Sequence, residues 1–311
     1  MFSGNTFIPG RVRACSSTWA NPHSFQTSSD DPPPQVVFVV EEEFDSQRMG
    51  SHLPIKVLPP TFGPADVCKK SSFSKYSRCT LVKNFYALYT LYQSSSQNIK
   101  WYFTVGCDTY VNVPNLLSVL SAYDPTQPHL IGQCWDTKVE DAAAAGLLPG
   151  SKYANGGGGI AISAALMDAM IPKMEAWMAD QSKTHNSDLS IAGLAAAVAG
   201  ASCVHSDAFH GYSPRWYAAR PVDRQDPWGQ AHPHAASFHY MSPDDMFQLD
   251  QSLALESIAS LWHSSPSSLP ALSEALVREH YATLSTLSHA LRMCESSYDL
   301  STATASQKVS H

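Results

Sequence analysis

The stretch WYFTVGCDTYVNVPNLL, residues 101–117, places one carboxylate at the end of an otherwise apolar segment. Its first five residues, WYFTV, predict a buried strand, and VPNLLSVLSAYD, residues 113–124, predicts a helix. Between the two lies the turn Gly106-Cys107-Asp108. Ligands of open α/β sheets gather beyond the carboxyl ends of strands, so Asp108 stands where a functional site is expected.

The segments around this stretch alternate between strand and helix patterns. Further strands are expected in VVFVV (36–40), IKVLP (55–59) and HLIGQC (129–134). Further helices are expected over residues 78–94, 164–180 and 187–200, the last capped by Ser187 or Asp188. Residues 136–154 are expected to be a surface excursion, and residues 243–297 a helical hairpin. This alternation predicts an α/β fold.

Composition excludes several classes of protein. The chain has 311 residues, of which 20 are basic and 27 acidic, giving a net charge of −7. No surplus of positive charge is available for a nucleic-acid backbone or an anionic membrane. No apolar run is long enough to span a bilayer. The seven cysteines include no CxxC pair, which argues against a zinc ribbon or a thioredoxin-type site, and their odd number leaves at least one thiol free.

Two interpretations of Asp108 follow from its position. A carboxylate at a strand end can hold a divalent cation such as Mg²⁺ or Mn²⁺, and that cation can neutralise a diphosphate. The same carboxylate can instead cap the helix that starts near Pro114, or organise the turn. Position alone does not separate the two.

The whole run from residue 101 to residue 132 resembles the metal-site region of the fringe-like β1,3-glycosyltransferase family, which includes fringe and the core 1 β3-galactosyltransferase. In the order of the family pattern the chain has Trp101, Asp108, Tyr110, Val111, Asn115, Leu116, Tyr123, Asp124, Pro125 and Gly132. Gly106 and Cys107 replace the first two acidic residues of the family's triplet. The resemblance implies a glycosyltransferase-A-type (Rossmann-like) nucleotide-sugar domain with a C-terminal helical extension, and a metal site that keeps its last aspartate.

The metal site implied by the resemblance combines Asp108 with a histidine. SFHYMSPDDMFQLDQ, residues 237–251, is similar to the region of the core 1 enzyme whose histidine completes the metal site, which indicates His239. FHGY, residues 209–212, resembles a fringe motif and makes His210 the second choice, with a structural hydrogen bond as its alternative role. The implied ion is Mn²⁺ or another divalent cation.

The glycine run NGGGGIAIS, residues 155–163, resembles a family motif in which the backbone closely approaches the donor and acceptor. The resemblance therefore implies that Gly156, Gly157 and Gly158 contact the UDP-sugar, as do Cys107 and Asp108. Location alone suggests four further donor-site residues: Glu42, Glu43, Asp45 and Lys83.

Inverting sugar transfer requires a base that takes the proton of the acceptor hydroxyl, and a carboxylate is ionised at neutral pH. Family members carry such an aspartate at the start of the helix after the glycine run, a position that Asp188 occupies here. Its alternative role is helix capping. Trp135, Trp216, Tyr217 and Trp228 can stack on acceptor sugar rings or simply fill a core.

Two further features resemble the family. Cys68 and Cys79 enclose ten residues, a spacing similar to a fringe disulfide, which implies the Golgi or another secretory lumen. RVRACSSTWA, residues 11–20, is similar to an early family segment, so the expected catalytic domain spans residues 1–242 and the extension residues 243–311. Membrane attachment is expected only through an anchor absent from this chain.

The resemblance implies transfer of a hexose, of galactose or N-acetylglucosamine type, from a UDP-sugar to a glycan or glycoprotein in a β1,3-type linkage. The alternative is a non-catalytic carbohydrate- or nucleotide-sugar-binding relative, motivated by Gly106 and Cys107. A glycoside hydrolase is a weaker third interpretation, because no closely matched pair of carboxylates emerges.

Overall fold

A computed structural model of the chain describes residues 8–21, 34–40, 55–59, 62, 73–94, 99–180, 186–219, 232 and 234–264. The chain divides into two compact units, Met1–Asp250 and Gln251–His311. The first unit holds the sheets and the functional residues discussed below. The expected boundary after residue 242 stays a prediction.

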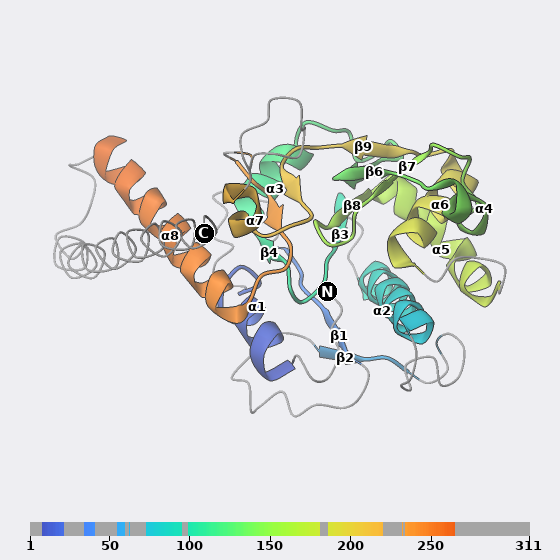
Figure 1. Cartoon of the computed structure of the whole chain (residues 1–311), viewed down its shortest axis with the longest axis horizontal. Coiled ribbons are helices and arrows are strands. Elements are labelled where there is room, and N and C mark those ends of the chain that lie inside the picture. The colour runs from blue at the N-terminus through green and yellow to red at the C-terminus, as the bar shows by residue number, and fades with distance from the viewer. Residues whose placement is uncertain are drawn as a thin grey trace, which may run out of the picture. The chain divides into compact units, whose positions relative to one another are not determined.

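A four-stranded sheet lies at the centre of the first unit (Figure 1). Its strand order is β3 (Trp101–Thr104), β8 (Ile160–Ser163), β5 (Leu130–Gly132) and β9 (Cys203–His205). β8 runs antiparallel to β3 and to β5, whereas β9 is parallel to β5. The strand predicted at residues 101–105 is confirmed, and Asp108 follows its carboxyl end.

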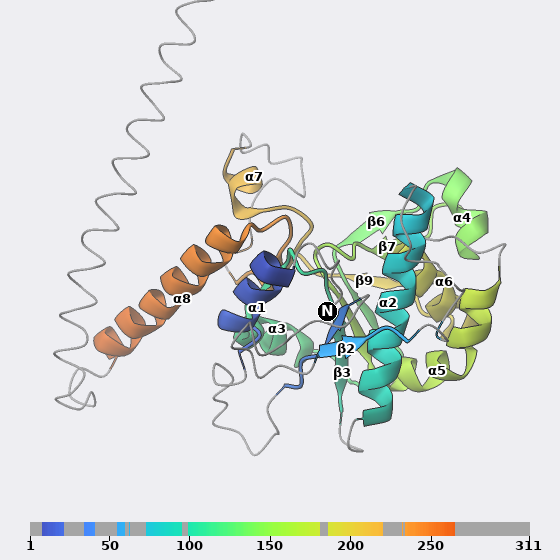
Figure 2. The same cartoon turned by 90° about the horizontal axis from the view of Figure 1, so that it is seen from below.

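Three helices pack together against this sheet: α2 (Phe73–Ser94), α5 (Ala164–Ala179) and α6 (Ser187–Ala199) (Figures 1 and 2). One hydrophobic core joins them to the strands. α5 contributes a stripe of buried side chains at helical spacing, namely Leu166, Met167, Met170, Met174 and Met178. The mixed α/β fold predicted from the sequence is confirmed.

A second, three-stranded sheet contains His210 and ends directly before His239. β11 (Ser237–Phe238) lies between β10 (Phe209–His210), to which it is parallel, and β4 (Tyr110–Val111), to which it is antiparallel. α3 (Val113–Leu120) follows β4, and α7 (Pro214–Ala218) follows β10. Because Phe238 pairs with Tyr110, this sheet brings the segment after β11 beside the turn that contains Asp108.

The N-terminal part of the chain adds short elements. η2 (Ile8–Val12) is a π-helix that runs into α1 (Arg13–Ser17). β1 (Phe38–Val40) and β2 (Ile55–Val57) form a parallel pair, and β1 contacts α2. α8 (Pro243–Ser264) begins in the first unit and continues into the second. No helix in the part of the chain that the structure describes is long and apolar enough to cross a membrane.

The segment expected to be a surface excursion, residues 136–154, is mostly exposed, but it also forms regular secondary structure. The segment contains α4 (Val139–Ala145) and β7 (Lys152–Ala154), and β7 pairs antiparallel with β6 (Cys134–Asp136). Four consecutive alanines, residues 142–145, favour the helix. Gly193 on α6 allows α4 to approach closely, because a Cβ there would overlap the carbonyl oxygen of Ala145.

The N-cap of α6 is Asn186 and not Ser187 or Asp188, the two residues expected from the sequence. The Asn186 side chain accepts hydrogen bonds from the amides of Asp188 and Leu189. Because Asn186 satisfies these amides, neither Ser187 nor Asp188 caps the helix. The Asp188 carboxylate is therefore available for another role.

A disulfide that the sequence did not indicate joins Cys134 on β6 to Cys203 on β9. Cys79 is also disulfide-bonded, but the Cys68 predicted as its partner lies outside the described residues, so that pairing stays a prediction. Cys15 and Cys107 are free thiols. The Cys134–Cys203 bond ties the β6–β7 ribbon to the edge of the central sheet.

Replacing both Cys134 and Cys203 by serine is expected to lower the free energy of unfolding. The bond joins cysteines 69 residues apart in the sequence. Disulfides typically stabilise a folded protein by about 2–4 kcal/mol, because they restrict the unfolded chain, and the effect grows with loop length. Urea unfolding of the double variant measures the effect. The free thiol variant Cys15→Ser serves as a control for serine substitution, and equal stability of the double variant and the parent would contradict the prediction.

Candidate active site

Asp108 lies between a histidine and an arginine that are distant in sequence. Its Oδ2 is 3.3 Å from Nη1 of Arg11, and its Oδ1 is 3.5 Å from Nε2 of His239. The Asp108 and His239 side chains are 19% and 17% exposed, so both are reachable from solvent without being fully hydrated. The structure thus brings together Asp108 and His239, as the sequence predicted.

The backbone fixes this arrangement. The Met241 amide donates to the carbonyl oxygen of Asp108 at 2.9 Å, and the His239 amide donates to the carbonyl oxygen of His210 at 3.0 Å. Asp108 is not the cap of the following helix, because Asn112 caps α3. The capping interpretation of Asp108 is therefore excluded.

The imidazole of His239 has a defined orientation. Its Nδ1 lies 3.2 Å from the carbonyl oxygen of Gly211, which can only accept a hydrogen bond, so Nδ1 carries the proton. Nε2 then faces the Asp108 carboxylate, another acceptor. Two acceptors face each other favourably only with a proton or a cation between them. In metal-binding histidines the other ring nitrogen usually donates a hydrogen bond to a carbonyl or carboxylate oxygen, as Nδ1 does here.

The charge of Asp108 is stabilised by its neighbours. Burial raises the pKa of this carboxyl, but the hydrogen bond and charge of His239 and the charge of Arg11 outweigh burial and hold the pKa below its ordinary value. Asp108 is consequently ionised at neutral pH.

The glycine run, residues 156–159 between β7 and β8, packs against the side chains of Asp188 and His239 and the backbone of His210. A Cβ on Gly156 would overlap the carboxylate of Asp188, and a Cβ on Gly157 would overlap the imidazole of His239. Gly158 lies against the backbone of His210, where a Cβ would approach the carbonyl carbon to 3.3 Å. The glycines are therefore needed because the side chains of the site occupy the space of their missing Cβ atoms.

Asp188 is bound to the glycine run directly. Its Oδ2 accepts a hydrogen bond from the Gly156 amide at 2.8 Å, and its Oδ1 accepts one from Oγ of Ser187 at 3.0 Å. Burial nevertheless raises the pKa of this carboxyl above its usual value, although both hydrogen bonds and the charge of His239 oppose the increase. A carboxylate of raised pKa is a better proton acceptor, which suits a general base.

Replacing Gly157 by alanine is expected to displace His239. The new methyl group would occupy the space of the imidazole, so the histidine must turn away from Asp108. We expect Mn²⁺-dependent UDP binding, measured by isothermal titration, to weaken about tenfold or more, the range for loss of support around a metal ligand. Gly158→Ala, whose Cβ meets neighbouring atoms at 3.3 Å or more, is the matched control and should weaken binding less. Equal effects of both variants would contradict the prediction.

His210 is buried in a different environment. Its Nε2 accepts a hydrogen bond from the His232 amide at 3.0 Å, and its ring stacks on Phe238 at a centroid distance of 4.8 Å. Burial lowers the pKa of His210 from 6.5 to about 4. Among the described residues no hydrogen bond or ion pair links His210 to Asp108, so the geometry favours the structural role for this histidine.

This buried histidine predicts a pH dependence of stability. Because the folded-state pKa of His210 is about 4 and the unfolded value 6.5, the unfolded chain takes up a proton first as the pH falls. The free energy of unfolding should fall between pH 6.5 and pH 4, by up to roughly 3 kcal/mol. Urea unfolding of His210→Gln should show a flatter pH profile than the parent. His234→Gln, at an exposed position, is the control, and a parent-like slope in His210→Gln would rule the prediction out.

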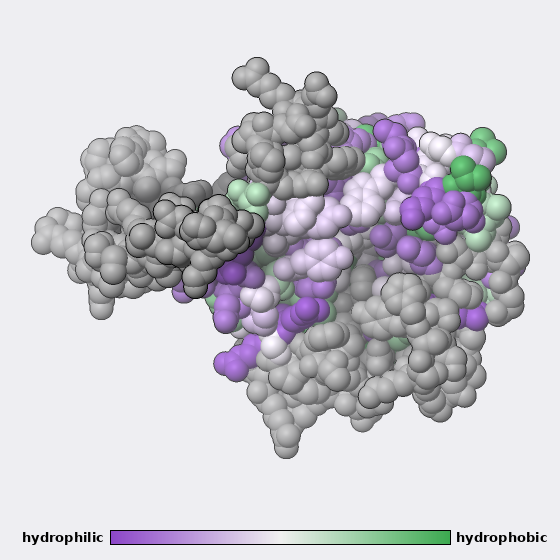
Figure 3. All heavy atoms as spheres, viewed as in Figure 1, coloured by the Kyte–Doolittle hydropathy of each residue, from purple (hydrophilic) through white to green (hydrophobic). Residues whose placement is uncertain are grey.

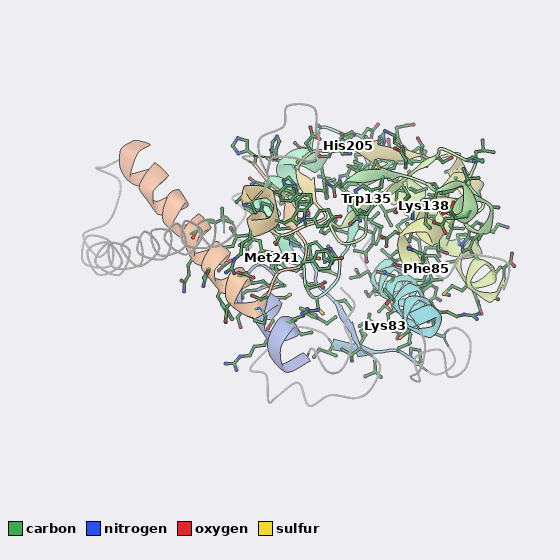
Figure 4. All side chains as sticks on the ribbon, in the orientation of Figure 1. Lys83, Phe85, Trp135, Lys138, His205 and Met241 are labelled. Atoms are coloured by element: carbon green, nitrogen blue, oxygen red, sulfur yellow. A yellow bond between two sulfur atoms is a disulfide. The ribbon has the colours of Figure 1, made fainter. Side chains whose placement is uncertain are left out.

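The remaining donor-site predictions have mixed outcomes. Glu42, Glu43 and Asp45 lie outside the described residues, as does Trp228. Lys83 lies on α2 (Figure 4) and is only 2% exposed. The Cys107 side chain is buried, and its carbonyl oxygen accepts a hydrogen bond from the thiol of Cys15 at 3.4 Å. The contacts of these residues with a donor stay predictions.

Sequence reasoning did not identify Arg11 as a site residue. It lies in the early segment whose resemblance to the family was noted, and that segment was the available signal. Among the described residues no cluster of three or more His, Cys, Asp or Glu side chains is arranged to hold a metal ion. Of the described residues, Asp108 and His239 are those that would hold a metal at this site.

A family profile described as Fringe-like matches residues 60–257, more than half of the chain. The chain belongs to the Fringe-like family. Its fold resembles a crystal structure of the galactosyltransferase LgtC in complex with donor and acceptor sugar analogs, with a TM-score of 0.51, 14% sequence identity, and coverage of 81% of this chain and 94% of that one. Family and fold are thus those of a glycosyltransferase, of the A type that the sequence predicted.

Two other solved structures are less similar. An active-site mutant of LgtC gives a TM-score of 0.48 at 15% identity, covering 77% of this chain and 85% of that one. The structure of mouse xyloside xylosyltransferase 1 gives a TM-score of 0.39 at 10% sequence identity, covering 76% of this chain and 96% of that one. A comparison with curated protein sequences gave no match.

Proposed function

We propose that this Fringe-like protein is an inverting glycosyltransferase that moves a hexose, of galactose or N-acetylglucosamine type, from a UDP-sugar to a hydroxyl of a glycan or glycoprotein, in a β1,3-type linkage. The observation that carries the proposal is the convergence of two functional groups on one glycine run. Gly156 contacts the carboxylate of Asp188, and the adjacent Gly157 contacts the imidazole of His239, which in turn faces Asp108.

Asp188 has the properties that the base of this reaction requires. Its carboxylate is held by two hydrogen bonds and has a raised pKa in a largely buried position. The acceptor hydroxyl gives its proton to this carboxylate while its oxygen attacks the anomeric carbon from the side opposite the leaving diphosphate. Attack from that side inverts the anomeric configuration and yields a β-linkage from an α-linked donor.

The donor set at Asp108 fits a divalent cation. One carboxylate and one imidazole suit Mn²⁺, and the proton on Nδ1 of His239 leaves Nε2 directed at Asp108. When bound, such an ion would neutralise charge that develops on the leaving diphosphate. Asp108 and His239 would hold it, whereas Arg11 places a fixed positive charge beside the same carboxylate and can stabilise the diphosphate itself.

A specific observation favours a second candidate, a non-catalytic binding protein. Gly106 and Cys107 supply no carboxylate, and Cys107 is buried next to Cys15, so the site has less negative charge than the family triplet would provide. A weak metal site in the absence of donor follows from either candidate. Only turnover separates them.

Release of UDP from UDP-sugars by the purified chain tests the proposal. We expect UDP-galactose or UDP-N-acetylglucosamine, but not both equally, to be hydrolysed slowly with Mn²⁺ present. Binding of UDP without any turnover, in the presence of a glycan panel, would support the binding protein. If no UDP-sugar is bound with Mn²⁺ present, both candidates are wrong.

We further propose that the protein works in the lumen of the secretory pathway. Two cysteines form the Cys134–Cys203 disulfide and Cys79 is disulfide-bonded as well, and such bonds persist in oxidising compartments. The partners in that compartment would be the nucleotide-sugar donor and a glycan or glycoprotein acceptor.

A further inference from the structure

Tyr240 has an unusual backbone conformation directly beside the candidate active site. Its φ is 55°, and among the residues that the structure describes no other non-glycine residue has a positive φ. A bulky residue in this region is strained, and such strain persists where the surroundings enforce it, often at functional sites. The hydrogen bonds of the flanking residues, from the His239 amide to His210 and from the Met241 amide to Asp108, enforce it here.

The ring of Tyr240 is exposed despite this strain. The residue is 61% exposed, and its ring stacks on the imidazole of His239 with a centroid distance of 3.8 Å. Burial contributes little to holding it, so core packing does not explain the conformation. What the conformation achieves is to present an aromatic ring next to His239 and Asp108.

Other partly exposed rings continue from Tyr240 to form a surface that we term the aromatic band. Tyr212 lies 6.2 Å from Tyr240 and stacks on Trp216 at 4.0 Å. Trp135 lies 6.2 Å from Tyr212 on the other side and 6.5 Å from Tyr153. The band therefore contains Tyr240, Tyr212, Trp216, Trp135 and Tyr153, contributed by four separate segments of the chain.

The band differs from a second aromatic group beside it. His210 and Tyr217 are buried and pack edge to face at 4.7 Å, as core residues do. Tyr217 is thus unavailable for the sugar stacking considered from the sequence. None of the five band residues is buried. Figure 3 shows side chains of intermediate hydropathy gathered on the face in view, and Figure 4 labels Trp135 of the band and Met241, the residue after Tyr240.

The chemistry of this surface matches sugar rings. Tyrosine and tryptophan combine an apolar face with a polar group, and so they favour ligands that are apolar on one side and hydrated on the other. Trp135 and Tyr153 are cross-strand partners in the β6–β7 ribbon, so their side chains lie on the same face of it. A single pyranose has two faces and cannot stack on five rings, so the band has room for several sugar units.

We propose that the aromatic band is an extended acceptor subsite that binds an oligosaccharide of two or more sugar units, with the unit to be modified on Tyr240 and the preceding units toward Trp135. This rests on the proposed glycosyltransferase function. It adds that the acceptor is a chain of sugars and that Trp135, on β6 and separated from Tyr240 by Tyr212, selects for its length.

An array of immobilised mono-, di- and trisaccharides, probed with labelled protein in the presence of UDP and Mn²⁺, tests the proposal. We expect the parent to prefer at least one di- or trisaccharide over its terminal monosaccharide. Trp135→Ala should reduce this preference about threefold to tenfold, the range for loss of an aromatic stack. Tyr89→Ala, an exposed ring of α2 outside the band, is the matched control and should keep the preference.

A pair of variants at Tyr240 separates binding from folding. Tyr240→Gly and Tyr240→Ala remove the same ring, but only glycine relieves the positive φ, so the glycine variant should melt about 2–8 °C higher than the alanine variant. Both should lose oligosaccharide binding equally. If the more stable glycine variant binds oligosaccharides like the parent, the band does not include Tyr240 and the proposal fails.

The outcomes also separate this proposal from the proposed function. UDP binding by the parent, measured by thermal shift with Mn²⁺, reports on the donor site alone. If UDP is bound but the parent shows no preference for longer saccharides, or Trp135→Ala keeps that preference, the extended subsite is refuted while the donor site stands. If UDP is not bound, the failure lies in the proposed function.

Discussion

Asp188→Asn should lower sugar transfer roughly 10²–10⁴-fold, the usual cost of removing a general base. Asparagine has the same shape: its one carbonyl oxygen can accept the hydrogen bond of the Gly156 amide, and its NH2 group can donate to Oγ of Ser187. It cannot take a proton at neutral pH. The variant should therefore bind donor and acceptor and fail in the chemical step, so that kcat falls while KM changes little.

Stability should respond in the opposite direction. Burial raises the pKa of Asp188 in the folded chain, so at neutral pH the ionised carboxylate costs stability relative to the unfolded chain. The cost is greatest above the raised pKa and disappears as the pH falls below the ordinary value of 3.8. Asp188→Asn removes the charge, and its melting temperature at pH 7 should equal or exceed that of the parent.

The control is Asp141→Asn, because Asp141 is also a half-buried aspartate in the first turn of a helix. It should keep full activity. The pH profile gives an independent check, since kcat/KM of the parent should rise with pH through the raised pKa of Asp188 and Asp188→Asn should lack this limb. Unchanged transfer by Asp188→Asn would leave that carboxylate only the role of holding the glycine run.

The sequence predicted that Asp108 follows the end of a strand, because local patterns encode that position. A strand, a turn with Asp108, and a glycine run are each readable from consecutive residues, and the family resemblance added Asp188 and His239. The structure explains the glycines in a way no pattern could: Gly156 and Gly157 are required by side chains that lie far away in the sequence.

Features that depend on long-range contacts were missed. Arg11 reaches Asp108 across 97 residues, and the Cys134–Cys203 bond spans 69. Connectivity of cysteines cannot be deduced from spacing alone. The positive φ of Tyr240 results from hydrogen bonds of its neighbours, and nothing in the sequence SFHYM signals it.

Errors in the predicted fold have local causes. Gly146, Pro149 and Gly150 favour turns in the segment 136–154, yet residues 139–145 form α4 and Tyr153 pairs with Trp135. The α6 cap was misplaced because three capping residues, Asn186, Ser187 and Asp188, stand in a row. Only the hydrogen bonds identify Asn186.

Asp108→Ala and His239→Ala should each abolish the Mn²⁺-dependent stabilisation of the protein by UDP. A ligand at a hundred times its Kd stabilises by about 2.7 kcal/mol, which corresponds to a rise in melting temperature of roughly 5–10 °C for a domain of this size. With two protein ligands for the ion, Asp108 and His239, either loss leaves a single ligand, which binds Mn²⁺ too weakly to couple to UDP.

The melting temperatures of these variants without ligand should change little. The neighbours of Asp108 lower its pKa, so its charge adds stability above the ordinary pKa that is lost as the pH falls, but the pair with Arg11 is partly exposed and contributes modestly. The matched control is Asp207→Ala, which breaks another aspartate–histidine pair, with His205 at 2.8 Å, outside the site. It should keep the full metal-dependent shift. A full shift in Asp108→Ala or His239→Ala would instead show that the replaced residue does not hold the ion.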